Sequence, residues 1–138
     1  MHRHAEGSFK EIETSKKVVA HLKEYGLEDH FIKPTAKTGL VVDIIGQSEE
    51  VEENKEKISC IALRADMDAL PMPENNPHIE YQTVTDHAHM CGHDGHTTCL
   101  LGFAEFAIKN RHKLPQNKKI RLFFQPAEEL IGGAKIMI

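Results

Sequence analysis

The sequence predicts an α/β domain in which helices cover a central β-sheet. Three short apolar, β-branched runs that suit strands alternate with amphipathic stretches that suit helices. A chain of 138 residues forms one domain at most, and a domain of this size buries roughly two thirds of its unfolded surface. Hydrophobic residues make up 40% of the chain and charged residues 28%, which is typical of a soluble globular protein.

The first half of the chain contains one predicted helix and two predicted strands. In residues 8–25 apolar side chains recur at helical spacing, and Gly26 offers a stop signal. The runs 39–45 (GLVVDII) and 58–63 (ISCIAL) suit buried strands. Residues 47–57 are charged and unpatterned, so we expect an exposed connection whose glutamates take no part in chemistry.

The second half begins with a long loop, predicted for residues 71–86 because they are rich in proline, asparagine and other polar residues. Loops of this length inside compact domains are often functional. A helix is expected over 97–109, and we interpret Cys99 as a core residue on its apolar side. The run 120–124 (IRLFF) is the third predicted strand, and another helix begins near Gly133.

Charge and composition argue against several classes of protein. The formal net charge of −4 is unsuited to nucleic-acid binding, which needs a basic face. No apolar run approaches the roughly 20 residues that span a bilayer, and the first residues lack the apolar core of a secretory signal. We therefore expect a cytoplasmic protein without membrane contact, although a longer natural amino terminus would change this. Three cysteines (Cys60, Cys91 and Cys99) make no disulfide framework and suggest free thiols or a metal ligand.

Two pairs of carboxylates follow directly after predicted strands. Asp66 and Asp68 come after one strand, and Glu128 and Glu129 come after another. Ligands in open α/β sheets collect beyond the carboxyl ends of the strands, so both pairs are expected at that edge.

A cluster of potential metal ligands lies between the long loop and the following helix. Four histidine or cysteine side chains fall within eight residues: His89, Cys91, His93 and His96. In an extended or loop segment residues i and i+2 point the same way, so Cys91 and His93 could converge on one ion, with Gly92 allowing close approach. Thiolate and imidazole are preferred ligands of zinc and suit several other transition metals. Asp94 is placed to cap the helix, and together with His89 and His96 it is expected to orient the ligands or contact substrate.

Two other interpretations of this cluster remain open at this point. Cysteines are often simply buried, and histidines in loops often have no role, but the clustering favours a metal site. A thiol enzyme would use Cys91 as nucleophile with His93 or His96 as base. Sensitivity to a chelator would separate a metal site from a thiol enzyme.

The adjacent carboxylates Glu128 and Glu129 suit metal-assisted hydrolysis. Like charges side by side raise one another's pKa, and a nearby divalent cation relieves that cost. Because adjacent side chains diverge, one carboxylate can bind metal while the other takes a proton from the reacting water. The alternative is a pair in the first turn of a helix, where its dipole favours them. Asp68 or Asp66 could orient a histidine ligand through a hydrogen bond without binding the metal itself.

These segments resemble the metal-dependent aminoacylase-like amidohydrolases, which include hippurate hydrolases and indole-acetyl-amino-acid hydrolases and are related to carboxypeptidase G. The matching segments cover nearly the whole chain in order: HRHAEGSFKEIETS, TGLVVDI, LRADMDALPMPE, HMCGHDGHTT and FFQPAEE followed by IGGAKIMI. One small departure is Ala5, where the family usually has proline.

The resemblance implies roles for individual residues. In the family the Cys and His of the CGH segment bind the metal pair, which implies Cys91 and His93 as ligands. The second Glu of PAEE is a ligand and the first is the general base, which implies Glu129 and Glu128 respectively. Asp68 matches an aspartate near the site of related peptidases.

The resemblance also implies fold, cofactor and substrate. The expected fold is part of a zinc-peptidase-like catalytic domain, with a central mixed sheet and helices on its faces. The expected cofactor is a pair of zinc or manganese ions, and the expected reaction is hydrolysis of the amide bond of N-acyl amino acids.

Residues 1–138 are expected to form the amino-terminal part of the catalytic domain. Two further histidine ligands, the inserted domain through which the family often dimerises and the remaining catalytic segment are expected beyond it. A catalytic zinc wants three protein ligands plus water, so the three ligands named here suffice for one ion at most. We therefore expect little or no hydrolysis by this chain alone. The alternative is a non-catalytic metal-binding fragment or interaction module.

Overall fold

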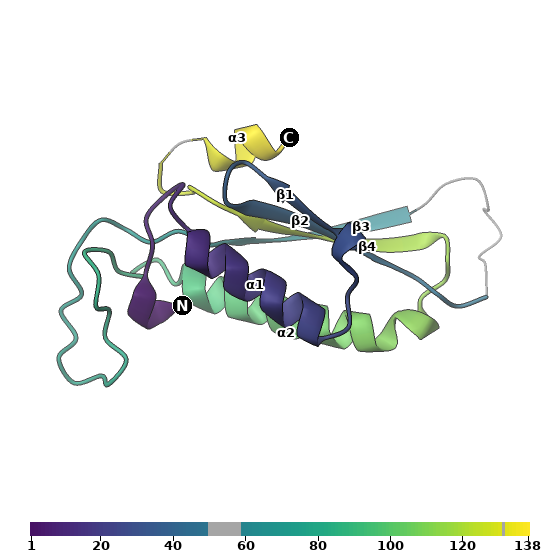
Figure 1. The fold of residues 1–138 in the computed structure, drawn as a ribbon, viewed down its shortest axis with the longest axis horizontal. Helices are drawn as coiled ribbons and strands as arrows, with labels where there is room; N and C mark the ends of the chain where they lie inside the picture. Colours follow the sequence, from purple (N-terminus) through teal and green to yellow (C-terminus); the bar gives the residue numbers. More distant parts are fainter. Residues whose placement is uncertain (50–58, 131) are drawn as a thin grey trace.

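The computed structural model describes residues 1–49, 59–130 and 132–138. The described residues contain one four-stranded mixed sheet and three α-helices (Figure 1). The strands are β1 (Ile32–Thr35), β2 (Gly39–Ile45), β3 (Ser59–Asp66) and β4 (Lys118–Gln125), in the order β1-β2-β4-β3. The helices are α1 (Ile12–Glu24), α2 (His93–Asn110) and α3 (Gly133–Met137), with short 3-10 turns at His2–His4, Asp29–Phe31 and Arg111–Lys113. The predicted α/β class with a mixed sheet is confirmed.

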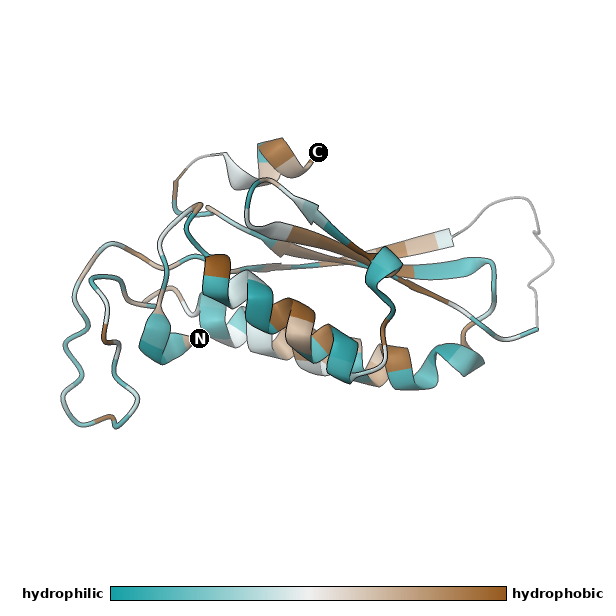
Figure 2. Ribbon diagram, viewed as in Figure 1, coloured by the Kyte–Doolittle hydropathy of each residue, from teal (hydrophilic) through white to brown (hydrophobic). Residues whose placement is uncertain are grey.

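The two long helices cover one face of the sheet. α1 and α2 lie side by side against it, and the short α3 lies on the opposite side (Figure 1). The core fills the space between the two long helices and the sheet. Figure 2 shows hydrophobic residues along the central strands and on α1. Leu40, Val42 and Ile44 alternate along β2 toward this core, whereas Asp43 points to the other face and pairs with Arg121 of β4 at 2.7 Å. Strand alternation therefore gives the sheet one apolar face and one polar face.

The strand predictions hold, with one omission. β2 has the predicted bounds, and β4 extends the predicted run by two residues toward its start and one toward its end. β3 runs on to Asp66, beyond the predicted end at residue 63, while residue 58 and most of the predicted connection lie outside the described residues. The sequence did not indicate β1, a four-residue edge strand that contains Lys33 and Pro34 and has no apolar alternation.

Both long helices begin at residues other than those predicted. α1 begins at Ile12, later than the predicted start at residue 8, because Phe9 has a φ of 60°, a left-handed conformation that no helix can contain. α2 begins at His93, four residues before the predicted start at residue 97. His93 and His96 therefore belong to the helix itself.

The interpretation of Cys99 as a core residue is wrong. α2 packs on the sheet through a different set of side chains, which includes Leu100, Leu101 and Ala104, and leaves Cys99 exposed. Phe103 lies one turn after Cys99 and is 37% exposed. The apolar residues of α2 therefore extend past the face that the sheet covers. Among the described residues, none of the helices is both long enough and apolar enough to cross a membrane.

Candidate metal centre

The two carboxylate segments meet at one edge of the sheet, as expected. β3 and β4 run parallel, and the last residues of both, Asp66 and Gln125, are register partners. The chain leaves each strand at this point, so Asp68 and Glu128 follow neighbouring strand ends. The amino-terminal end of α2 reaches the same edge, since Thr97 donates a hydrogen bond to the carbonyl of Asp66 at 2.8 Å.

Three potential metal ligands converge here. Ligand atoms of Cys91, His93 and Glu129 all lie within 4.8 Å of one another. His93 Nε2 lies 3.8 Å from Glu129 Oε1 and 3.9 Å from Glu128 Oε2. Atoms bound to one tetrahedral zinc lie roughly 3.5 Å apart, given bond lengths of about 2.0–2.3 Å. The spacing is that of a cation site whose side chains would close in slightly on binding.

The convergence of Cys91 and His93 has a different local cause from the one expected. The segment is not extended: Gly92 has a φ of 80° and is the N-cap of α2, and His93 is the first helical residue. A Cβ at position 92 would meet nothing within 4 Å, so the backbone angle alone favours glycine there. The expectation that Asp94 caps the helix is therefore wrong. Asp94 lies in the first turn, and its Oδ2 is 2.7 Å from His2 Nδ1.

Asp68 organises both halves of the site. His93 Nδ1 lies 2.8 Å from the carbonyl oxygen of Asp68, which can only accept, so Nδ1 carries the proton and Nε2 is left with its lone pair toward the glutamates. The carboxylate of Asp68 accepts the backbone N–H of Glu128 at Oδ1 and that of Glu129 at Oδ2, both at 3.0 Å. Ser8 donates a further hydrogen bond to Oδ2 at 2.6 Å. One aspartate thus fixes the imidazole through its backbone and the glutamate pair through its side chain.

The chemistry of this group fits a divalent cation. Glu129 Oε1 is buried and has no hydrogen-bond partner among the described residues, which is a costly arrangement for a carboxylate oxygen. The pKa of the Cys91 thiol is raised, first by its hydrogen bond to Glu129 and further by burial and the charges of Glu129, Glu128 and Asp66. A cation would satisfy the oxygen and reverse the effect on the thiol. Thiolate, imidazole and carboxylate together are a set of ligands that zinc accepts.

A second group of potential ligands shares a residue with the first. Ligand atoms of Asp66, His93 and His96 also lie within 4.8 Å of one another. His93 Nε2 is 3.7 Å from Asp66 Oδ1, and a single lone pair cannot serve two ions. Asp66 and His96 already satisfy each other through a 2.7 Å contact to His96 Nδ1, and Arg64 lies 3.1 Å from Asp66. The Cys91 group, with its unsatisfied oxygen, is therefore the better cation site.

His89 belongs to neither group of ligands. Its side chain is buried, and in the part of the chain that the structure describes neither ring nitrogen has a hydrogen-bond partner. Burial lowers the pKa of His89. Its ring centroid lies 6.3 Å from that of His2. His89 therefore lies beside the 3-10 turn at His2–His4.

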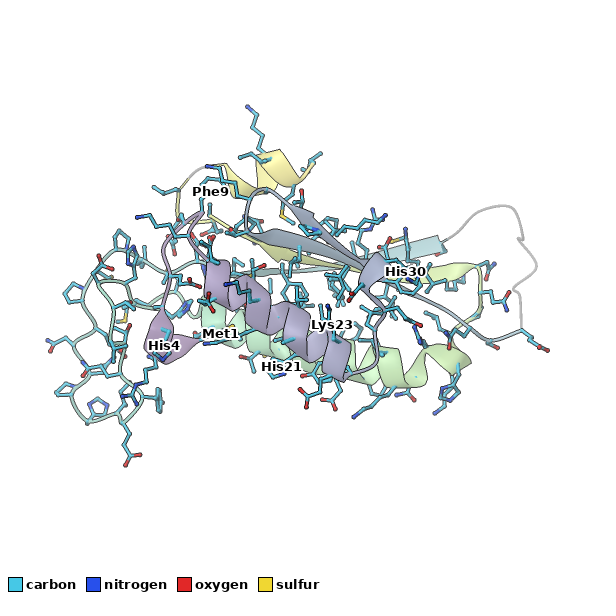
Figure 3. The ribbon with its side chains drawn as sticks, in the orientation of Figure 1. Met1, His4, Phe9, His21, Lys23 and His30 are labelled. Carbon is cyan, nitrogen blue, oxygen red and sulfur yellow. The ribbon has the colours of Figure 1, made fainter. Side chains whose placement is uncertain are left out.

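The contributions of Ser8 and Glu11 to the site were not predicted from the sequence, although both lie in a segment that carries the family resemblance. Phe9 lies at the turn between the first 3-10 turn and α1 (Figure 3). Ser8 reaches Asp68, and the fully buried Glu11 accepts the backbone N–H of Ala127 at 2.8 Å. Glu6 accepts the backbone N–H groups of Glu13 and Thr14 at the start of α1. A pattern of glutamates and serine ahead of a helix was the available signal, but it indicates a helix cap and says nothing of a partner over 100 residues away.

The family relationship is clear in sequence. Residues 62–138 match the profile of peptidase family M20/M25/M40. The chain is 43% identical over 141 residues to N-acetyl-L-cysteine deacetylase of Bacillus subtilis and 40% identical over 139 residues to hippurate hydrolase of Campylobacter jejuni. It is 39% identical over 137 residues to IAA-amino acid hydrolase ILR1-like 2 of Arabidopsis thaliana. These matches cover 99–100% of the chain but only 28%, 30% and 32% of the relatives.

The fold gives the same relationship. A dinuclear metal-binding peptidase of the M20 family from Bacillus subtilis superposes with a TM-score of 0.80 and 36% identity, covering 97% of this chain and 34% of that one. The chain therefore spans about a third of the length of its relatives. With the profile matching more than half of its residues, the chain belongs to peptidase family M20/M25/M40.

Proposed function

We propose that this chain supplies the first metal-binding segment of a hydrolase that cleaves the amide bond of N-acyl amino acids. The observation that carries the proposal is the convergence of Cys91, His93 and Glu129, with Glu128 beside them. The names of three relatives support the substrate class, because an acylated amino acid is common to all of them. Zinc suits the thiolate and imidazole better than manganese, which prefers oxygen ligands.

A bound metal ion would act as a Lewis acid toward the amide carbonyl and lower the pKa of a bound water. In this arrangement Cys91, His93 and Glu129 hold the ion, and Glu128 accepts a proton from the water. Glu128 suits this role because its side chain is 41% exposed while Asp68 fixes its backbone. The same carboxyl would then return the proton to the departing amine.

The number of ligands limits what the chain does by itself. Three ligands hold one ion, whereas the related peptidase of known structure is dinuclear. We propose that residues 1–138 are the amino-terminal part of the catalytic domain. The second ion would need ligands from the region that corresponds to the other two thirds of the relatives. On this basis the chain alone binds at most one ion and hydrolyses N-acyl amino acids weakly or not at all.

Metal stoichiometry tests the site. We expect the 138-residue chain to retain about one zinc ion after dialysis, and Cys91→Ser to weaken zinc binding by at least tenfold, because a hydroxyl replaces a thiolate ligand. Cys99→Ser is the matched control, since Cys99 is exposed eight residues further on and should leave binding unchanged. Elemental analysis and competition with a chromogenic chelator measure both. Equal zinc affinity in the two variants would show that Cys91 is not a ligand of the ion.

A second candidate is a non-catalytic one-ion module, which an assay for release of amino acid from hippurate tests: weak turnover that a chelator abolishes favours the hydrolase, and no turnover at all favours the module. The three-ligand set favours this alternative for the isolated chain. Full turnover by the isolated chain would contradict the ligand argument. A thiol hydrolase is disfavoured because the pKa of Cys91 is raised, whereas a nucleophilic cysteine needs a lowered one.

A further inference from the structure

Glu11 is a fully buried carboxylate that accepts three hydrogen bonds from the described residues. Oε1 accepts the backbone N–H of Phe9 at 3.1 Å and that of Ala127 at 2.8 Å, and Oε2 accepts the hydroxyl of Thr38. These donors come from three separate parts of the chain: the amino-terminal segment, the turn between β1 and β2, and the segment after β4. Glu11 thus joins parts of the backbone that secondary structure does not connect.

Among the described residues, every non-glycine residue with a positive φ lies at, or within two positions of, a residue that donates a hydrogen bond to Glu11. Four residues other than glycine have a positive φ there: Phe9 (60°), Ala36 (46°), Lys37 (68°) and Ala127 (49°). Glu11 binds the amides of the first and last directly, and it binds Thr38 immediately after the other two. A left-handed residue with a side chain costs roughly 1–2 kcal/mol, so such a conformation persists only where its surroundings enforce it. Glu11 therefore contacts two of the four residues directly, Phe9 and Ala127, and the residue that follows the other two.

Ala127 directly precedes the two glutamates of the candidate site. Three consecutive amides, those of Ala127, Glu128 and Glu129, are bound by two buried carboxylates, Glu11 for the first and Asp68 for the other two. Glu11 therefore contacts neither the ligand atoms nor the proton acceptor, but it binds the peptide group that sets the direction in which both side chains leave the backbone.

We propose that Glu11 is a positioning residue, which holds Ala127 in its left-handed conformation and thereby aims the Glu128 and Glu129 carboxylates at the metal centre. The inference rests on the proposed function of those carboxylates. Without Glu11, the buried amide of Ala127 loses its acceptor and the strained φ loses its support. The peptide would then relax, and both carboxylates would turn away from His93.

The test uses the 138-residue chain and Co²⁺ as a spectroscopic probe. Glu11→Gln keeps the shape of the side chain but replaces one accepting oxygen with a donating group. We expect about tenfold weaker Co²⁺ binding and altered d–d bands, because Glu129 leaves the coordination sphere, while the thiolate-to-cobalt band of Cys91 persists. Faster hydrogen exchange of the Ala127, Glu128 and Glu129 amides, measured by NMR without metal, reports the same change independently.

Two further variants make the result specific. Ala127→Gly in the Glu11→Gln background should restore the cobalt spectrum, because glycine adopts a positive φ without strain. Glu6→Gln is the matched control: Glu6 belongs to the same segment, and among the described residues its side chain accepts hydrogen bonds at the start of α1 and none from Ala127, Glu128 or Glu129. It should lower the melting temperature without changing the cobalt spectrum.

The outcomes separate the two proposals. Wild-type amide exchange and an unchanged cobalt spectrum in folded Glu11→Gln would overturn the positioning role while leaving the metal centre intact. If Glu11→Gln alone fails to fold, a folded double variant with restored bands supports the role, and an unfolded double variant refutes it. If the wild-type chain binds no Co²⁺, the metal centre fails, and amide exchange alone decides the role of Glu11.

Discussion

At the scale of single residues, the site depends on carboxylates that bind backbone amides. Asp68 and Glu11 are both buried, and the hydrogen bonds to their side chains come from N–H and O–H donors. They surround the glutamate pair with negative charge while holding it in place. Such a concentration of negative charge beside an unpartnered oxygen of Glu129 favours a cation over any anionic ligand.

Glu74 shows the same use of a carboxylate in the long loop. The backbone N–H of Thr83 binds its Oε2 at 2.7 Å, and this bond, opposed by burial and aided by Asn76 and His2, lowers the pKa of Glu74 from 4.5 to about 2. A carboxyl whose pKa is depressed in the folded state adds stability above its unfolded pKa and loses it as the pH falls through the folded one.

We therefore predict a pH-dependent effect of Glu74→Gln. The difference in stability between the variant and the wild type should be largest between about pH 4.5 and the raised pKa of His2, which pairs with Glu74. It should shrink as the pH falls toward 2 and also as His2 loses its proton at higher pH. Urea unfolding at a series of pH values measures this difference, and the other carboxyls cancel because both proteins contain them. A difference that grows as the pH falls below about 4.5 would show that Glu74 does not stabilise the fold as an anion.

The sequence indicated some of these residues and not others, for a physical reason. Cys91, His93 and Glu129 could be proposed as ligands from the sequence because thiol, imidazole and carboxylate side chains are evident there, and the structure brings the three together. The role of Glu11 depends on the backbone angle of Ala127, 116 positions away, which no local pattern encodes. The wrong assignment of Asp94 has a similar origin, because Gly92 begins the helix through its backbone rather than through a side-chain cap.

At the scale of elements, the pattern of apolar residues predicted the central strands of the sheet most accurately. β2 and β4 lie in the middle of the sheet, and their apolar runs were recognised nearly to the residue. β1 was missed because an edge strand with Lys33 and Pro34 is selected by its pairing with β2 and not by its own composition. The start of α1 differed from the prediction because Phe9 has a left-handed φ, and the start of α2 differed because Gly92 begins that helix through its backbone conformation.

The packing of α3 over the segment after β4 gives a second prediction. A Cβ at Gly133 would lie 1.7 Å from the carbonyl oxygen of Pro126, a backbone atom that cannot easily move. Gly133→Ala should therefore destabilise the protein by about 1–3 kcal/mol and displace α3.

The matched control is Gly102→Ala in the middle of α2. A Cβ there meets nothing within 4 Å, so the substitution should stabilise the helix by about 0.5–1 kcal/mol. Thermal unfolding followed by circular dichroism measures both. Similar melting temperatures for the two variants would contradict the close approach at Gly133.

At the scale of the whole molecule, one side carries an uncovered apolar face, which we define by Ile61, Leu63, Phe103, Phe106 and Ile120. Ile61 and Phe106 are each 65% exposed, and Ile61 is the register partner of Ile120. Two hollows of about 510 Å³ and 390 Å³ share Phe103 and extend along this face. It lies along β3, which is at the edge of the sheet in the described residues.

An exposed apolar face of this kind promotes association. We predict that the chain self-associates in the micromolar range and that Phe106→Glu shifts it toward monomer by roughly tenfold in dissociation constant. Val84→Glu, which replaces a 60% exposed residue of the long loop, is the control and should have no effect. Sedimentation velocity over a concentration series measures both. Equal behaviour of the two variants would place the contact elsewhere.

The parallel pairing of β3 with β4 also determines when the site can exist during folding. The ladder joins residues about 60 positions apart in the sequence, and α2 must cross between the strands before Asp66 meets Gln125. Contacts between residues so far apart in the sequence form late in folding. The chain must lose the conformational entropy of closing the intervening loop before these contacts can stabilise it. The ligand cluster is thus assembled near the end of the folding reaction, and an ion bound there would slow unfolding far more than it would speed folding.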